Sequence, residues 1–191
     1  MPESKTYLIK QLKNIENAKR VNRLRVSNLV LQNPELFKYL LELIFEVDNK
    51  ISIKSAWVLE FVLFENLDWL APHLNYFTEN MSKVKFDSAV RPISKICEFL
   101  AKAYTSKNNS IMKAEINSNH IDKIIEAAFD WLIGNQKVAV KVYSMELLFL
   151  FGKNKDWIHK ELHLIIQQNI TNESAAYQAR GKKILSWINK K

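Results

Sequence analysis

Apolar residues recur every three or four positions along most of the chain, and polar residues fill the positions between them. This spacing is typical of amphipathic helices that bury one face against their neighbours. We therefore expect a chain of helices joined by short polar turns. The expected helices start near residues 6, 18, 34, 51, 68, 86, 120, 138, 156 and 173.

One pattern of apolar and polar positions occurs twice. Residues 51–74 and 138–162 align with one extra residue in the second copy's turn. In each copy an apolar helix leads through a polar turn to an Asp, which we expect to cap a second helix opened by Trp. The first helix of each copy is apolar on nearly every face, so we expect other helices to cover it on several sides. The matching pairs are Lys54 with Lys141, Phe64 with Phe151, Asp68 with Asp156, Trp69 with Trp157, and Leu74 with Leu162.

Several residues indicate where helices begin and end. Asn33 followed by Pro34 is typical of a helix start, with an N-cap and a proline at the first helical position. Asn119 is the expected N-cap of the helix that follows it, and Gly134 is the expected end of that helix. These signals divide the apolar stretches into pairs of helices.

Residues 105–119 are polar and rich in Asn, and we interpret them as a long loop with one helical turn at about 111–115. Pro92 lies inside an otherwise helical pattern, so either the helix kinks there or a short turn precedes it. The predicted fold is an all-α superhelix of about four to five helix pairs. It forms a single domain over residues 1–191, with a terminal cap helix at about 6–15.

Composition agrees with this prediction. The chain has 191 residues and is 48% hydrophobic, with only 3 Gly and 4 Pro, too few for the many turns of a sandwich or barrel. The single cysteine, Cys97, has apolar neighbours and is expected to be a buried thiol, which suits a reducing cytoplasm. No apolar stretch approaches the roughly 20 residues that span a bilayer, and the first residues lack the pattern of a signal peptide. We expect a soluble, cytoplasmic protein.

The net charge of +8 is concentrated at the two ends of the chain. Through Val30 there are seven basic and two acidic residues, and from Arg180 onward there are five basic and no acidic residues. The long stretch between them carries a slight acidic excess. Basic ends could meet nucleic-acid phosphates, or they could be solubilising caps of a repeat protein. The candidate phosphate contacts are Lys19, Arg20, Arg23, Lys182 and Lys183.

These features resemble HEAT-like and armadillo-like α-solenoids. The likeness depends on the paired helices, the internal Pro92, and basic residues near the start of first helices, namely Lys54, Lys141 and Arg180. Residues 91–100, 145–162 and 175–185 are also similar to short bacterial HEAT-like proteins of unassigned function, some of which are labelled adenylosuccinate lyase. That lyase label has no support here, because the mobile Gly-Ser-Ser loop typical of the lyase superfamily is absent from the sequence.

Residue patterns for chemistry are few. His159 and His163 are four positions apart on one predicted helix, but no third metal ligand accompanies them, so helix-face histidines are the favoured interpretation. The sequence pairs no nucleophile with a base, and 3 glycines form no phosphate-binding loop. We therefore expect no enzymatic activity, no metal and no cofactor.

The resemblance implies that the second helices of the pairs line a concave surface. His73, Tyr76 and Asn80 follow helical spacing on one such helix, and His163 and Gln167 lie on the second helix of the other copy. Trp69 and Trp157 occupy equivalent places, which favours packing between repeats over binding. The leading hypothesis is a scaffold that binds a protein or peptide on this surface. The alternative is a nucleic-acid-binding protein that uses its basic terminal helices.

Overall fold

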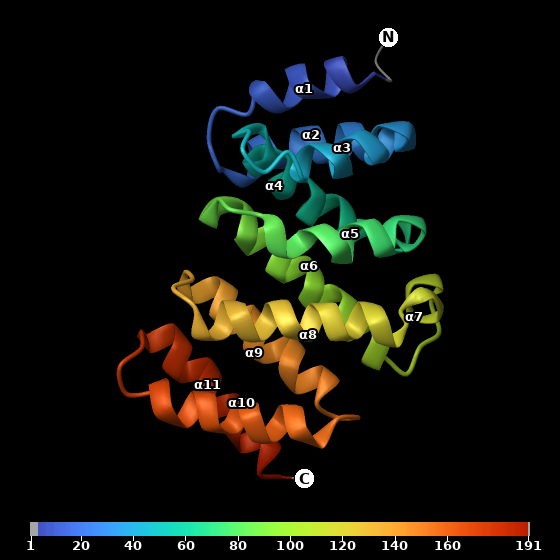
Figure 1. The fold of residues 1–191 in the computed structure, drawn as a ribbon. Helices are drawn as coiled ribbons and strands as arrows, with labels where there is room; N and C mark the ends of the chain where they lie inside the picture. The colour runs from blue at the N-terminus through green and yellow to red at the C-terminus, as the bar shows by residue number, and fades with distance from the viewer. Residues whose placement is uncertain (1–3, 191) are drawn as a thin grey trace. The chain divides into compact units, whose positions relative to one another are not determined.

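The structure is a computed structural model that describes residues 4–190, and in this part of the chain the secondary-structure elements are all helices (Figure 1). The all-α prediction is therefore confirmed. The fold divides into two compact units, each defined by the contacts within it. Unit 1 extends up to Ile96, and unit 2 begins at Cys97. Its α-helices are α1 (Lys5–Lys13), α2 (Arg20–Gln32), α3 (Phe37–Ile44), α4 (Ile51–Glu65), α5 (Leu74–Asn80), α6 (Asp87–Thr105), α7 (Ile111–Glu115), α8 (Ser118–Ile133), α9 (Val138–Phe151), α10 (Asp156–Asn169) and α11 (Ala175–Ile188). Short 3₁₀ helices cover Pro34–Leu36, Leu67–His73 and Met81–Lys83.

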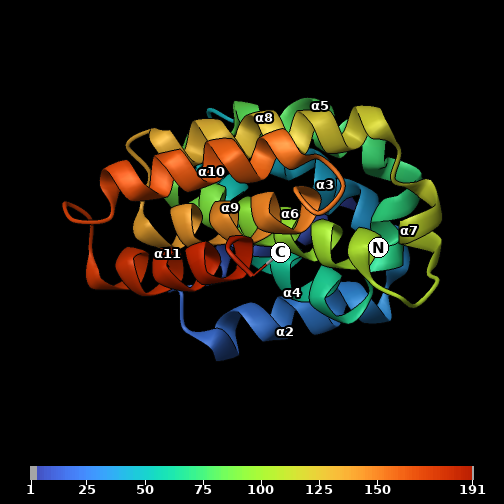
Figure 2. The ribbon, with the colours of Figure 1, turned by 90° about the horizontal axis from the view of Figure 1, so that it is seen from below.

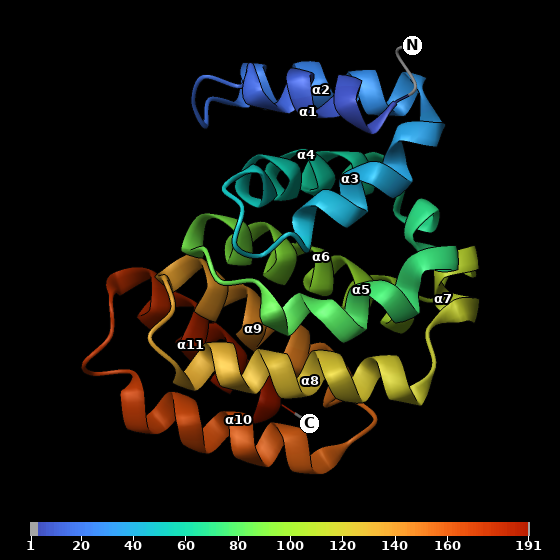
Figure 3. The same cartoon turned by 45° about the horizontal axis from the view of Figure 1, so that its top comes forward.

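Helix α4 forms the centre of unit 1. It packs against α1, α2, α3 and the 3₁₀ segment Leu67–His73, and Figure 3 shows α3 crossing in front of it with α1 and α2 above. Val58, Leu59 and Val62 of α4 are fully buried. Because other helices cover α4 on several sides, residues on nearly every face of this helix are apolar.

Helix α9 has the same role in unit 2. It packs against α8, α10 and α11, and Figure 2 shows α8 and α10 on one side of α9 and α11 on the other. Its residues Val140, Met145 and Leu147 are fully buried. The two copies of the sequence repeat thus supply the central helix of each unit, as expected from their apolar patterns.

The predicted caps are only partly right. The two repeat aspartates do not cap: the N-cap positions are Asn66 and Lys155, and Asp68 and Asp156 lie in the first turns that follow. At these positions their negative charges interact favourably with the positive end of the helix dipole. Helix α8 starts two residues earlier than expected, so its N-cap is Asn117 and not Asn119.

The Asn117 cap is a capping box. The Asn117 side-chain oxygen accepts from the His120 backbone N–H at 3.1 Å, and His120 Nδ1 accepts from the Asn117 N–H at 3.3 Å. The expected end at Gly134 is confirmed, since α8 stops at Ile133 with Gly134 as its C-cap. The interrupting segment contains α7 at Ile111–Glu115, where one helical turn was predicted.

Helix α6 runs through Pro92 without a break. A proline has no N–H, so the Ser88 carbonyl four residues earlier lacks its usual helical donor. The Trp57 indole of α4 donates to that carbonyl at 2.9 Å. A side chain of the neighbouring helix therefore takes the place of the missing backbone bond, which explains why the helix continues.

The single cysteine and the apolar helices behave as expected. Cys97 is fully buried, and burial raises the pKa of its thiol well above the usual range. Within residues 4–190, no helix combines the length and hydrophobicity that crossing a membrane would require. The predicted superhelical path and the single-domain boundary stay predictions.

Candidate functional site

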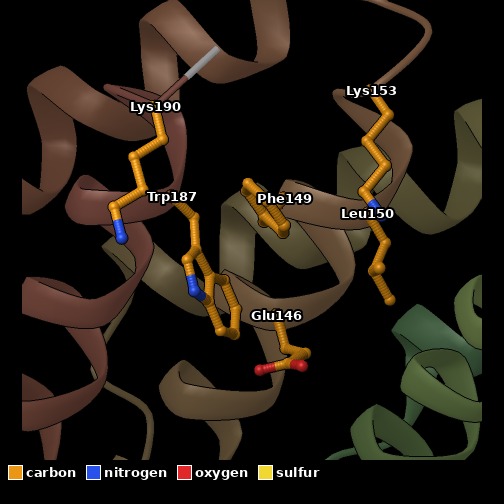
Figure 4. A pocket seen from close by; sticks show the side chains of 6 residues that line it. All are labelled: Glu146, Phe149, Leu150, Lys153, Trp187 and Lys190. Carbon is orange, nitrogen blue, oxygen red and sulfur yellow. The ribbon is translucent and has the colours of Figure 1, made fainter.

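Unit 2 has an open pocket of about 430 Å³ with aromatic walls, which we call the Trp187 pocket. Its walls come from the second half of α9, the end of α11 and the residues just after each of these helices. Figure 4 shows the Phe149 ring between Trp187 and Leu150, with Lys190 beside Trp187 and Lys153 beside Leu150. The centroids of the Phe149 and Trp187 rings are 5.1 Å apart, in a tilted arrangement. The lining residues are Glu146, Phe149, Leu150, Lys153, Trp187 and Lys190.

Phe149 is held in place from behind by His159. The two rings stack at a centroid distance of 5.2 Å, and His159 is only 5% exposed. His159 Nε2 lies 2.8 Å from the Phe149 carbonyl oxygen and donates to it, because a carbonyl only accepts. The ring fits because Gly152 lacks a side chain: a Cβ at this position would lie 2.1 Å from His159 Cδ2. One wall of the pocket is thus fixed before any ligand arrives.

Positive charge surrounds the aromatic pair. Lys153 Nζ lies 5.7 Å from the Phe149 centroid, and Lys183 Nζ lies 4.8 Å from the Trp187 centroid, both within cation–π range. Among the described residues that line the pocket, Glu146 is the one acid, and Arg180 of α11 forms an ion pair with it. The pocket therefore combines an apolar interior with a basic edge.

Unit 1 has a pocket of similar size, about 440 Å³, which we call the Trp69 pocket. Here Phe37 makes an edge-to-face contact with Trp69 at 5.7 Å, and the His73 ring lies 5.7 Å from Phe37. Two acids and one lysine line it, so its edge is slightly acidic. The lining residues are Pro34, Glu35, Phe37, Lys38, Asp68, Trp69, Pro72 and His73.

The residues of the predicted partner-binding surface belong to both units. His73 lines the Trp69 pocket, and Tyr76, which is 41% exposed, packs edge-to-face against Phe45 at 5.4 Å. The Asn80 side chain donates to the Tyr76 carbonyl at 2.8 Å, so these two residues of α5 are held together.

The other two residues, His163 and Gln167, lie on α10 of unit 2, half-buried and exposed respectively. Neither lines the Trp187 pocket. The predicted surface is thus divided between the two units.

The basic residues of the alternative hypothesis also belong to both units. Lys19, Arg20 and Arg23 lie at the start of α2 in unit 1. Arg20 and Arg23 rest against the Phe61 ring, with their Cζ atoms 5.6 Å and 5.0 Å from its centroid. In unit 2, Lys182 is exposed and Lys183 lies over Trp187.

Trp157 is less buried than the repeat suggests. It stacks on Phe129 at 5.9 Å, yet it is 54% exposed. Its counterpart Trp69 is half-buried against Phe37. Equivalent sequence positions therefore have different surroundings in the two units.

The histidine pair of α10 does not form a joint site. His159 is buried in its contact with Phe149, whereas His163 is half-buried one turn further on. Among residues 4–190, no three His, Cys, Asp or Glu side chains come together in a group that could hold a metal ion.

Sequence reasoning missed the Trp187 pocket. Trp187 lies three positions after Ile184, a spacing that favours the apolar face of the helix, but it is only half-buried. A signal was present, because lysines at 182, 183 and 190 flank Trp187 in the sequence. An aromatic residue among cations favours a position at the edge of the core.

No protein family, curated protein or solved structure matches this chain. The resemblance to HEAT-like and armadillo-like proteins therefore stays a prediction.

Proposed function

We propose that this chain is a non-enzymatic helical-repeat scaffold, an α-solenoid that binds a protein segment in the Trp187 pocket. The observation that carries the proposal is the open aromatic pocket with a basic edge. Trp and other large aromatic residues dominate binding energy at protein interfaces, where they receive or supply apolar anchors. The wall formed by Phe149 is held by His159 at 5.2 Å, so little ordering is needed on binding.

The edge of the pocket indicates the partner's charge. Lys153 and Lys190 line it and Lys183 lies on Trp187, and Glu146, the one acid among its described lining residues, forms an ion pair with Arg180. A complementary partner is an acidic segment that carries one large apolar or aromatic residue. That side chain would enter between the rings, and its acidic neighbours would meet the lysines.

Other lines of support concern the whole chain. Both repeat copies become central helices covered by their neighbours, which is how a helical repeat buries its core. In the solenoid proposal, His73, Tyr76, Asn80, His163 and Gln167 are further contacts along the second helices. A buried Cys97 thiol suits the cytoplasmic location that we include in the proposal.

The test is an affinity capture from native lysate with and without nuclease. The bait proteins are the wild type, the double variant Lys153→Glu/Lys190→Glu and the control Lys182→Glu. The control reverses the charge of an exposed lysine of α11 that does not line the pocket. We expect a stoichiometric protein that survives nuclease, is lost with the double variant and is kept with the control. A protein retained equally by all three baits would overturn the role of the pocket.

The nucleic-acid alternative predicts a different result in the same experiment. Captured proteins would disappear after nuclease treatment, and Lys182→Glu would weaken binding as much as the pocket variant. Nucleic acid bound directly would also lose affinity steeply between low and physiological salt.

A further inference from the structure

Two arginines lie against Phe61 of α4 in unit 1, and a third forms an ion pair with the preceding residue, Glu60. Arg20 and Arg23 come from successive turns of α2 and lie against the ring at 5.6 Å and 5.0 Å. Arg91 of α6 approaches Glu60, with its Nη1 atom 3.1 Å from Glu60 Oε2. We call these three residues and Glu60 the arginine cluster.

The charges of the arginine cluster are not balanced. As defined, it contains three guanidinium groups and a single carboxylate, and that carboxylate forms an ion pair with Arg91. Among residues 4–190, neither Arg20 nor Arg23 forms an ion pair with an acid, and Arg23 Nε is buried without a hydrogen-bond acceptor. Buried donors without acceptors are uncommon in folded proteins.

The environment of Arg23 shows the same imbalance. Burial lowers the pKa of Arg23, Glu60 opposes this shift, and the nearby charges of Arg91 and Arg20 lower the pKa further. A guanidinium group stays protonated at neutral pH. An anion bound to the exposed parts of these guanidinium groups would therefore relieve the repulsion between the arginines.

We propose that the arginine cluster is a binding site for a phosphate monoester dianion. Planar guanidinium groups present paired N–H donors that match phosphate oxygens, and the Phe61 ring holds two of them in position. Arg20 and Arg23 bring two positive charges to one ring, which matches a dianion. Nucleic-acid phosphodiesters carry one charge each and are spread along a strand, so they match this compact cluster less well.

This site is built from residues of unit 1, whereas the Trp187 pocket is built from residues of unit 2, and the phosphate proposal does not depend on the peptide-binding proposal. A free phosphate ester and a phosphorylated side chain would present the same group. The test therefore uses inorganic phosphate, O-phosphoserine and a phosphoserine-containing peptide of otherwise neutral sequence as probes. A tighter fit of the peptide than of O-phosphoserine identifies a protein source, and equal affinities identify a small ester.

Binding is followed by NMR of the arginine Nε–Hε signals in the 191-residue chain at pH 7.5. We expect saturable shifts with inorganic phosphate that are at least tenfold weaker in Arg23→Gln and in Arg20→Gln. Arg25→Gln is the matched control, because Arg25 lies on the same helix but donates to the Gln11 side chain at 2.9 Å. Arg23→Lys should recover only part of the affinity, since it keeps the charge and loses the planar fork.

Protonation of the ligand gives an independent readout. The second pKa of a phosphate monoester is about 6, so affinity should fall as the pH drops from 7.5 to 5. Dimethyl phosphate, a monoanion throughout this range, should bind at least tenfold more weakly than inorganic phosphate. No saturable shift with phosphate, or an equal response to dimethyl phosphate, would overturn the proposal. Tighter, strongly salt-dependent binding of a single-stranded oligonucleotide would replace it with a nucleic-acid surface.

Discussion

Gly152 is the residue that lets His159 reach the back of Phe149. Because Gly152 has no Cβ, there is space for the imidazole. A Cβ at this position would lie 2.1 Å from His159 Cδ2. A glycine is needed here because the His159 ring lies close to the Gly152 backbone. An unusual backbone conformation is not the reason, since no residue in the described range has a positive φ. One small residue at the end of α9 therefore controls both local packing and the pocket wall.

We predict that Gly152→Ala displaces His159 and destabilises the protein. Overpacking of this kind costs about 1–3 kcal/mol in the free energy of unfolding, measured by chemical denaturation. The double variant Gly152→Ala/His159→Ala is the control, because it removes the clash. It should be less destabilised than the sum of its single variants. Simple additivity would show that the two residues do not interact.

Tyr177 gives a prediction for pH dependence. It is 1% exposed, and its hydroxyl has no hydrogen-bond partner among the described residues. Burial, with a contribution from the Glu173 charge, raises the pKa of Tyr177 to about 12 from 10.0. Above pH 10 the unfolded chain releases this proton more readily than the folded protein, so stability falls as the pH rises from 10 to about 12.

Tyr177→Phe should lose less stability than the wild type over that pH range. At pH 7 its free energy of unfolding should be equal to or above that of the wild type, because the variant removes an unsatisfied buried hydroxyl. Tyr76→Phe, at a residue that is 41% exposed, is the matched control and should follow the wild type. A Tyr177→Phe curve that runs parallel to the wild type would contradict the assignment.

At the scale of the elements, the start of α8 shows where sequence signals become ambiguous. Asn117, Ser118 and Asn119 are all good capping residues, and the apolar pattern alone favoured Asn119. The structure uses Asn117, because His120 then falls at the third helical position and completes the capping box. The reciprocal side-chain bond decides among neighbours that have the same propensity.

Asn117→Ala should therefore destabilise the protein by about 1 kcal/mol, the usual cost of a lost N-cap. Asn119→Ala, which is exposed within the first turn, should change the free energy of unfolding by no more than about 0.5 kcal/mol. Thermal and chemical unfolding of both variants would check this order. Equal losses would mean that the capping box adds nothing to stability.

The elements that the sequence predicted best are those with a strong local pattern. The central helices α4 and α9, the short α7 and the end of α8 at Gly134 all follow from apolar spacing and turn residues. The continuation of α6 through Pro92 could not be predicted, since the donor comes from Trp57, 31 residues before Ser88. Local signals reveal a missing hydrogen bond but not the distant group that replaces it.

At the scale of the whole molecule, the same limit applies to the candidate sites. The Trp187 pocket joins α9 to α11, and the arginine cluster joins α2, α4 and α6. Helical periodicity places Trp187 on an apolar face but does not say which helix covers that face. The excess of basic residues near both ends could therefore be predicted from the sequence. The aromatic rings that these cations contact could not.

The central claim is that the Trp187 pocket binds an acidic protein segment with an apolar anchor. The most direct measurement is selection of a displayed random-peptide library on the wild type, on Lys153→Glu/Lys190→Glu and on Lys182→Glu. We predict that the wild type and Lys182→Glu enrich acidic peptides with one aromatic or large aliphatic residue, and that the double variant does not. Peptides without acidic residues, or acidic peptides that bind the double variant equally well, would contradict the claim.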